Sequence, residues 1–225
     1  MDTELTDTEI ELKFLVSDNV IAHIPAIITE FAKKVINKPS RNLQNAYFDT
    51  ASRELRALDI GLRTRCFGGE TCNDNQCEQT IKLAGKVVGG LHQRPEYNLP
   101  LEGKHPDLSL FDANIWPHGM QIDVINKNIY PIFSTNFIRR TWILETESGT
   151  KIELVLDKGE ISASNQVESI CEVEMELVSG SRSDLFILAQ KLISHSEVRL
   201  GLYSKAARGY RIADNKPLIA DSTLN

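Results

Sequence analysis

The stretch Glu9-Ile10-Glu11-Leu12-Lys13-Phe14 determines how the rest of this chain is interpreted. Side chains of a β-strand point alternately to two faces, so Glu9, Glu11 and Lys13 share one face and the apolar residues share the other. Two carboxylates two residues apart could hold a hard divalent cation, and the lysine could bind an anion. The pattern equally describes a half-buried strand whose polar face lies in water, so the stretch alone leaves both interpretations open.

A second acidic strand is expected near the C-terminus. The stretch Cys171-Glu172-Val173-Glu174-Met175-Glu176-Leu177 again places three carboxylates on one face and apolar side chains on the other. Like charges directly opposite each other on neighbouring strands repel. If the two strands meet, a cation must lie between them, which gives the hypothesis of a carboxylate metal site.

Composition sets broad limits on the class of protein. The chain has 225 residues, a formal net charge of −6 and a pI near 5.4. This length is enough for one large domain with a sizeable core. The acidic balance argues against a general binder of nucleic acid or membrane surfaces. No apolar run is long enough to span a bilayer and the first residues do not resemble a signal peptide, so a cytoplasmic location is the default expectation.

The four cysteines are Cys66, Cys72, Cys77 and Cys171. They do not predict a disulfide framework in a chain of this size. Cys72 and Cys77 are separated by four residues and have no histidine nearby, which is a poor zinc signature. A polar hairpin tip over residues 68–77 is the preferred interpretation.

Helices are predicted where apolar residues recur at helical spacing. The first helix is expected to begin near Ser17, to run through Val35 and to end at residues 37–40. Pro25 either kinks this helix or occupies its first turn. Another helix is expected from a capping serine at position 181 or 183 through Ile193. The segment 103–128 lacks strand alternation, which favours two short helical turns.

Alternating segments predict about eight strands, with a turn at Lys158-Gly159 after one of them. They lie at residues 9–14, 44–49, 61–67, 78–83, 93–98, 137–144, 151–157 and 172–177. The middle strands carry basic residues on their polar face: Arg63, Arg65, Lys82, Arg94 and Arg139. Paired arginines two residues apart suit a phosphate or a carboxylate, although an edge strand protected by charge would look the same.

The distribution of charge favours a closed barrel with its charged face inward. A flat sheet with one wet face would explain the alternation, but it would not explain why acidic and basic residues occupy different strands. Buried charges are costly unless they are paired, metal-bound or neutralised by a ligand. Sites made only of carboxylate oxygens favour Mg²⁺ or Mn²⁺. A metal bound to a polyphosphate would satisfy both sets of charges.

The chain resembles the CYTH domain of the triphosphate tunnel metalloenzyme superfamily, and more narrowly the bacterial inorganic triphosphatases. The resemblance covers residues 8–212 and rests on several segments. They are Glu-Ile-Glu-Leu-Lys-Phe (9–14), Gly-Leu-Arg-Thr-Arg (61–65), Gly-Gly-Leu-His-Gln-Arg-Pro-Glu-Tyr-Asn (89–98), Phe-Ser-Thr (133–135), Cys-Glu-Val-Glu-Met-Glu-Leu (171–177) and Ser-Lys-Ala-Ala-Arg-Gly-Tyr (204–210). The resemblance implies an α+β fold, an eight-stranded antiparallel β-barrel with a charged lumen and helices outside. It also implies a tunnel domain over 1–212 and a C-terminal tail or linker over 213–225.

The resemblance implies roles for residues that match the family pattern. Basic residues expected to bind the triphosphate are Lys13, Arg63, Arg65, Lys82, Arg94, Arg139, Lys205 and, more weakly, Arg208. Metal ligands are expected at Glu9, Glu11, Glu172, Glu174, Asp157 and Glu153. The residues expected to act in catalysis are Glu9, Glu11, Lys13 and Lys205. Glu96 and Glu176 are expected elsewhere in the lumen, while Lys158 and Arg140 have the wrong strand parity to face it.

The reaction implied by the resemblance is hydrolysis of inorganic triphosphate to pyrophosphate and phosphate with Mg²⁺ or Mn²⁺. Cations and metal would align the terminal phosphorus, and a carboxylate or second metal would activate water. The alternatives are a CYTH-type adenylate cyclase, a nucleoside or thiamine triphosphatase, and a polyphosphate-binding module without turnover. Such proteins often carry a helical CHAD domain after the CYTH part, so a missing C-terminal CHAD domain is a further expectation.

Overall fold

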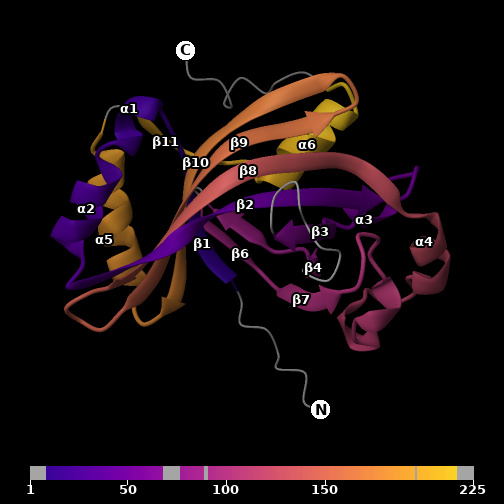
Figure 1. Cartoon of the computed structure of the whole chain (residues 1–225). Coiled ribbons are helices and arrows are strands. Elements are labelled where there is room, and N and C mark those ends of the chain that lie inside the picture. The colour runs from indigo at the N-terminus through magenta and orange to yellow at the C-terminus, as the bar shows by residue number, and fades with distance from the viewer. Residues whose placement is uncertain (1–8, 68–76, 89–90, 196, 217–225) are drawn as a thin grey trace.

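The computed structural model describes residues 9–67, 77–88, 91–195 and 197–216, which form one antiparallel sheet with helices on both of its sides (Figure 1). The strands are β1 (Glu9–Val16), β2 (Lys34–Asp49), β3 (Gly61–Phe67), β4 (Cys77–Lys82), β5 (Lys86–Val88), β6 (Leu91–Arg94), β7 (Glu96–Leu101), β8 (Tyr130–Glu145), β9 (Lys151–Ala163), β10 (Gln166–Ser179) and β11 (Val198–Leu200). The α-helices are α1 (Asp18–Ile21), α2 (Ile24–Phe31), α3 (Glu54–Ala57), α4 (Ile122–Asn128), α5 (Arg182–Ile193) and α6 (Lys205–Ala213).

The sheet is curled into a barrel-like tunnel. Its strand order is β5-β6-β1-β10-β9-β8-β2-β3-β4-β7, and β11 pairs with β1. β6 and β7 are far apart in this sheet order, with β7 at its last position. In the chain, however, Pro95 alone separates the two strands. The Leu83 N–H donates a backbone hydrogen bond to the Pro95 carbonyl at 3.0 Å. The two sides of the sheet therefore meet at this residue. The predicted α+β tunnel is confirmed. Eleven strands are present among the described residues, because β5 and β11 are too short to alternate recognisably and the predicted strand 93–98 is divided at Pro95 into β6 and β7.

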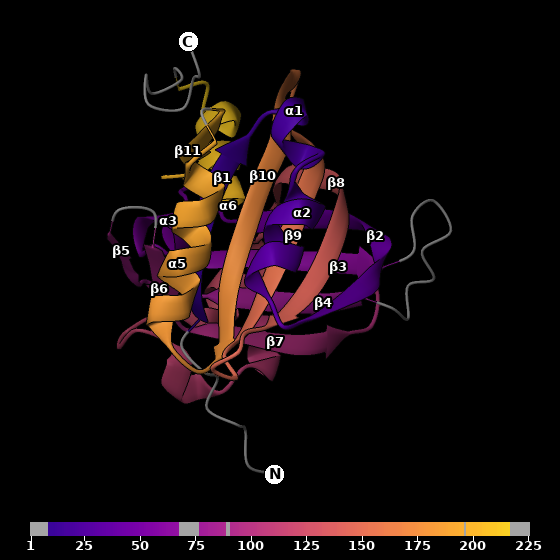
Figure 2. The same cartoon turned by 90° about the vertical axis from the view of Figure 1, so that its left-hand side faces the viewer.

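The apolar strand faces point outward and are covered at two places. α2 and α5 pack on the outer face of β1, β10, β9 and β8, where Phe14, Ile28, Leu154, Val173 and Leu188 belong to one buried cluster (Figure 2). The segment between β7 and β8 covers β3 and β4 in the same way. Where a helix or loop buries the outward apolar row of a strand, the charged row of the same strand faces the lumen. None of the described helices is long and apolar enough to cross a membrane.

α6 lies on the opposite, inner face of the sheet. Its residues Tyr210 and Ile212 pack with Phe133, Phe137 and Ile161 of β8 and β9. Gly209 is needed at this contact, because a Cβ atom there would overlap the Phe133 ring. Ser204 caps the helix through a hydrogen bond from the Ala207 N–H to its hydroxyl at 3.1 Å. The helix therefore begins inside one end of the tunnel, at Lys205.

Two sequence-based expectations about element boundaries are wrong. The first helix ends at Phe31, with Pro25 in the first turn of α2, and residues 34–49 form one long strand. This strand passes Pro39 at a register shift between Lys38 and Arg41, where the missing N–H of proline breaks no regular pair. The expected turn at Lys158-Gly159 lies inside β9, where Gly159 crosses the Phe137 backbone too closely for a Cβ atom.

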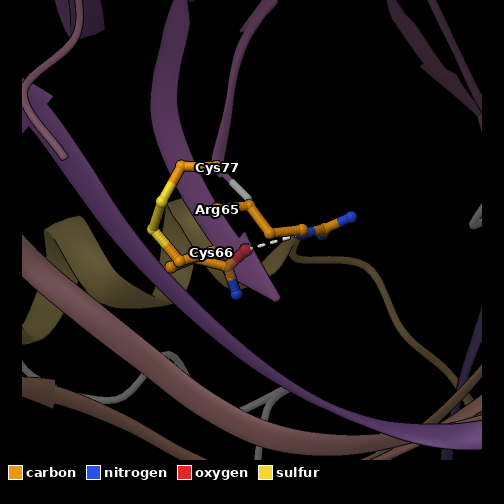
Figure 3. Close-up of a disulfide and its surroundings, with 4 residues drawn as sticks. Arg65, Cys66 and Cys77 are labelled. Carbon is orange, nitrogen blue, oxygen red and sulfur yellow. Dashed lines mark hydrogen bonds between the residues drawn. A yellow bond between two sulfur atoms is a disulfide. The ribbon is translucent and has the colours of Figure 1, made fainter. Parts of the chain in front are cut away.

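A disulfide joins Cys66 to Cys77, although the cysteine pattern did not predict a disulfide framework. The two residues lie directly opposite each other on β3 and β4, so the hairpin register brings their sulfurs together. Figure 3 shows the bridge beside Arg65, whose side chain extends away from it. Cys171 is a free thiol. Cys72 and the expected hairpin tip at 68–76 lie outside the described residues, and Cys77 is already bonded, which leaves the zinc alternative without one of its ligands.

Candidate active site

A cavity of about 510 Å³ runs through the curled sheet and is lined by side chains from its inner face. All of the predicted site residues except Asp157, Glu172 and Arg208 line it. Those that do are Glu9, Glu11, Lys13, Arg63, Arg65, Lys82, Arg94, Glu96, Arg139, Glu153, Glu174, Glu176 and Lys205. Lys158 and Arg140 point outward as expected, to Asp18 at 2.7 Å and over the Trp142 ring. Strand parity therefore placed the lumen correctly.

At one end of the cavity, three carboxylates converge on the ammonium of Lys205; we call Asp157, Glu172, Glu174 and Lys205 the paired cluster. Ligand oxygens of the three acids lie within 4.8 Å of one another. Lys205 Nζ lies 2.6 Å from Asp157 and 3.1 Å from Glu174, and it also contacts Glu172. Burial favours neutral Lys205, but the three carboxylates outweigh it and raise its pKa well above the ordinary value. This cluster is therefore neutralised from within the protein.

Arg139 and Arg208 compensate the remaining negative charge of the paired cluster from two directions. Arg139 donates two hydrogen bonds of 2.7 Å to Asp157. Arg208, one turn along α6 from Lys205, donates to Glu172 at 2.8 Å and to Glu168. Arg208 is buried behind the cavity wall, so its predicted contact with a ligand gains no support from the geometry. Its position instead fixes α6, and thereby Lys205, against β10.

A second acidic set crosses three neighbouring strands at the same level; we call Glu11, Glu176 and Glu153 the glutamate row. Glu11 of β1 is directly opposite Glu176 of β10, and Glu176 is directly opposite Glu153 of β9. Burial raises the pKa of Glu176 to about 7, and the nearby carboxylates Glu11 and Glu96 add to the effect. Lys82 opposes this effect only in part, so the charge of Glu176 is poorly compensated by cations. Lys13 contacts Glu11 at 2.9 Å and Lys38 contacts Glu153 at 3.0 Å, so Glu176 is the member of the row that an added cation would stabilise most.

Glu9 lies next to this row and has the same electrostatic character. Burial raises its pKa to about 7 against the opposing effect of Lys82, and Glu11 and Glu96 raise it further. Lys82 Nζ reaches across the lumen from β4 to Glu9 and Glu96, at 2.7 Å from each. Burial raises the pKa of Glu96, but Lys82 and Arg63 outweigh it and bring the value to about 2. Lys82 therefore pairs with both carboxylates, and the negative charge of Glu9 is less well compensated than that of Glu96.

Basic side chains crowd the opposite wall of the cavity. Burial, together with the charges of Arg63 and Arg139, lowers the pKa of Arg65 to about 9. Arg65 donates to Asn45 at 2.8 Å, and its nearest carboxylate, Glu78, is 3.6 Å away. Arg63 lies 3.6 Å from Glu96, and its buried Nε has no hydrogen-bond partner among the described residues. Guanidinium groups gathered this closely are stabilised by an anion.

Several residues of the cavity wall were not assigned from the sequence. They are Tyr47, Thr80, His92, Asn98, Phe137 and Ser204. His92 shares strand parity with Arg94, which was the available signal for it. No comparable signal placed Ser204 in the cavity wall, because residues 204–210 do not alternate between polar and apolar side chains as a strand does.

The donor set of the lumen fits a hard divalent metal ion. Its carboxylates offer oxygen ligands, which suit Mg²⁺ or Mn²⁺ better than metals that prefer sulfur or nitrogen. Two groups of acids are available, the paired cluster and the glutamate row with Glu9. The first already surrounds an ammonium, whereas the second holds two carboxyl groups with pKa values near 7. Lys13, Lys38 and Lys82 each contact one acid of the second group, but the raised pKa values of Glu9 and Glu176 make it the better-suited site for added positive charge.

A family model described as the CYTH domain matches residues 7–210. An inorganic triphosphatase of Haemophilus influenzae is 34% identical over 208 residues, which are 92% of this chain and 56% of that protein. The chain thus spans about half the length of this curated relative.

Among solved structures, HpAC1 from Hippeastrum, described as revealing a dominant triphosphatase activity, has a TM-score of 0.59 at 19% identity. The similarity covers 93% of this chain and 97% of that one. A protein from Pyrococcus horikoshii has a TM-score of 0.55 at 14% identity, covering 91% of this chain and 99% of that one. At these identities the two structures show a common fold.

Proposed function

Because the chain belongs to the CYTH domain family, we propose that it hydrolyses inorganic triphosphate to pyrophosphate and phosphate with a divalent metal ion. The observation that carries the proposal is the cavity itself, in which arginines and lysines face a set of carboxylates across one lumen. A metal-bound polyphosphate has both the negative charge and the cation that these two walls require. The name of the H. influenzae relative supports the choice of inorganic triphosphate among possible substrates.

We assign substrate binding to the basic wall. Arg63, Arg65 and Arg139 crowd one another without a ligand, so a polyanion would relieve their repulsion and accept their hydrogen bonds. Lys13 and Lys205 would hold further phosphate oxygens at the end where α6 begins. In the transition state the charge on the transferred phosphoryl group is spread over its oxygens, and fixed cations stabilise it without reorganising.

We assign the metal to Glu9, Glu11 and Glu153, with Mg²⁺ or Mn²⁺ as the ion. When bound, such an ion neutralises phosphate charge and lowers the pKa of coordinated water. The paired cluster has a supporting role in this proposal, because its acids hold Lys205 and Arg139 in place. Glu176, whose pKa is raised mainly by burial and by other carboxylates, would accept the proton of the attacking water.

Nucleotide substrates are the alternative within the same family. A nucleoside triphosphatase or cyclase needs space and an aromatic surface for the organic group. The rings that line the cavity are engaged already: Tyr47 stacks on Phe133, and Phe137 lies beneath Lys205 and Arg139. This favours the inorganic substrate.

The test is phosphate release from triphosphate, ATP and pyrophosphate side by side, with Mg²⁺, with Mn²⁺ and with EDTA. Release from triphosphate alone, lost in EDTA, is the expected result. Preference for ATP would move the assignment to the nucleotide branch. Tight triphosphate binding with no turnover would make the protein a binding module and end the proposal of hydrolysis.

We propose the cytoplasm as the location and expect no nucleic-acid partner, in keeping with the acidic charge of the chain. The Cys66–Cys77 bridge argues in the other direction, because disulfides are rare in reducing compartments. Thiol alkylation in intact cells, followed by mass analysis of this pair, distinguishes the two.

A further inference from the structure

A row of uncharged hydrogen-bonding side chains adjoins Arg63 on the basic wall of the cavity. Tyr47 of β2 lies directly opposite Arg63, and Arg63 lies directly opposite Thr80 of β4, which pairs with Asn98 of β7. All four residues line the cavity. Directly opposite residues on paired strands have Cβ atoms about 4.5–5.5 Å apart, so the Tyr47 side chain flanks that of Arg63. Arg63 has a role in the proposed function, whereas Tyr47 has none.

The Tyr47 ring is fixed by aromatic packing. It stacks on the Phe133 ring, with the centroids 4.4 Å apart and the ring planes at 15°. Phe133 is held in turn by the Tyr210 ring of α6, which meets it edge-on at 5.2 Å, and by the close approach of Gly209. Only 6% of Tyr47 is exposed. The position of its hydroxyl group is therefore set before a ligand binds.

The Tyr47 hydroxyl group makes no hydrogen bond with any described residue, yet it is not enclosed by protein atoms as Arg63 Nε is. The small accessible part of the side chain therefore includes the hydroxyl group, and it opens to the cavity that Tyr47 lines. A phenylalanine would make the same stack on Phe133, so ring packing does not account for the hydroxyl group.

The surroundings of this hydroxyl group determine the kind of partner that it can bind. Its oxygen lies within electrostatic reach of both Arg63 and Arg65. The nearest acceptor on the same strand, Asn45 Oδ1, already accepts from Arg65 at 2.8 Å. A phenol O–H is a neutral donor, and two guanidinium groups attract an anion whose oxygens are acceptors. A phosphate oxygen bound beside the arginines would therefore supply the acceptor that the hydroxyl group lacks.

We propose that Tyr47 is a substrate-binding residue whose hydroxyl group donates a hydrogen bond to the phosphate group held by Arg63 and Arg65. This inference rests on the proposed function for the identity of the ligand. A neutral donor orients a phosphate oxygen without adding positive charge to a wall where arginines already crowd one another. The contact requires no metal ion, because it is made on the wall opposite the carboxylates assigned to the metal.

The test is calorimetric binding of a non-hydrolysable imido analogue of triphosphate to the full chain, in EDTA and again with Mg²⁺. Tyr47→Phe keeps the ring and removes only the hydroxyl group. It should weaken binding of the analogue about tenfold in both conditions, the value of one hydrogen bond to a charged acceptor. The matched control is Tyr97→Phe, which should bind like wild type, because Tyr97 packs on the outer apolar cluster that covers β3 and β4.

Three binding results would overturn the inference. Unchanged binding by Tyr47→Phe would show that the hydroxyl group does not touch the ligand. A loss seen only with Mg²⁺ would assign the hydroxyl group to the metal ion instead of the phosphate. Equal losses in Tyr47→Phe and Tyr97→Phe would show that the position in the cavity is irrelevant.

Thermal unfolding without metal or ligand separates binding from packing. The Tm of Tyr47→Phe should equal that of the wild type, because the hydroxyl group has no protein partner among the described residues. A lower Tm that accompanies the loss of binding would trace the loss to the ring stack and overturn the inference.

The outcomes distinguish this inference from the proposed function. If the wild-type protein releases no phosphate but Tyr47→Phe weakens binding of the analogue, hydrolysis fails and the role of Tyr47 stands. If the protein hydrolyses triphosphate and Tyr47→Phe binds the analogue like wild type, the role of Tyr47 fails alone. If the wild type binds no analogue in either condition, both fail.

Discussion

Lys205 and Asp157 form a buried ion pair, with 2.6 Å between Nζ and Oδ2, at the point where α6 enters the tunnel. Asp157 is fully buried, so its charge depends on Lys205 and on the two hydrogen bonds from Arg139. Burial alone would raise the pKa of Asp157, and the two cations instead hold it below its ordinary value. The pair thus joins the last helix to the middle of the sheet.

Removing Asp157 should destabilise the fold. Asp157→Ala leaves two buried cations short of a partner, which costs about 3–5 kcal/mol of unfolding free energy. The measurement is urea unfolding without metal. The control is Glu30→Ala, which removes an exposed ion pair with Lys191 at 2.8 Å and should leave the unfolding free energy nearly unchanged. Equal losses in the two variants would contradict the role of burial.

Glu11→Gln should reduce triphosphate turnover by about 100-fold or more, because the amide keeps the size of the side chain and removes the charge that a metal needs. Turnover is measured as a function of Mg²⁺ concentration. Glu160→Gln, on the exposed side of β9, is the matched control and should leave turnover unchanged. Near-normal activity of Glu11→Gln would remove this residue from the metal site.

Arg63→Ala should weaken triphosphate binding by about 10- to 100-fold, the value of one or two charge-assisted hydrogen bonds. The KM for triphosphate and calorimetric binding of the non-hydrolysable analogue both report on it. Arg140→Ala removes an arginine of the outer face that lies over the Trp142 ring, and it should change neither quantity. A KM and kcat unchanged in Arg63→Ala would refute a phosphate contact.

The pKa of Glu176 makes the metal-free protein less stable as the pH rises. The folded state holds this proton up to about pH 7 and the unfolded state releases it near 4.5, so folding takes up a proton between these values. Stability contributed by the protonated group is therefore lost from pH 5 to pH 8. Glu176→Gln should flatten this loss and raise the Tm at pH 8 by about 3–6 °C, with little change at pH 5.

Thermal unfolding in EDTA at the two pH values measures the effect, with Glu160→Gln as the exposed control. A gain for Glu176→Gln of the same size at pH 5 and pH 8 would show that ionisation of Glu176 is not its cause.

The disulfide should stabilise the β3–β4 hairpin. Cys66 and Cys77 are separated by 11 positions, and closing a short loop of this kind contributes about 2–3 kcal/mol. Cys66→Ser with Cys77→Ser should therefore lower the Tm by about 5–10 °C. Cys171→Ser, which removes a free thiol, is the control. An unchanged Tm in the double variant would show that the bridge adds nothing to folding.

Alternation along single strands was enough to predict which side chains face the lumen. Arg63, Arg65 and Lys82 lie where their parity placed them, since a strand with one buried face has one permitted orientation. Parity could not reveal how charges combine across strands. Lys205 among the acids of the paired cluster, and Glu11 opposite Glu176, depend on register and on the docking of α6.

Two misassignments have the same origin in long-range contacts. Apolar spacing extended the first helix to Val35, whereas pairing with Leu144 on β8 holds this residue in a strand. Cys66 and Cys77 gave no local sign of bonding, because their meeting depends on the register of β3 and β4. Tertiary pairing decides such positions over local propensity.

The junction at Pro95 has a consequence for the size of ligand that can pass through the tunnel. Since β6 and β7 are consecutive in the chain and diverge from one residue, the seam of the tunnel at that point is a covalent link. A covalent link cannot separate as a pair of hydrogen-bonded strands can. The circumference of the tunnel at this level is therefore limited by the chain itself. A ligand that passes this level must therefore fit within a ring whose width the chain itself limits.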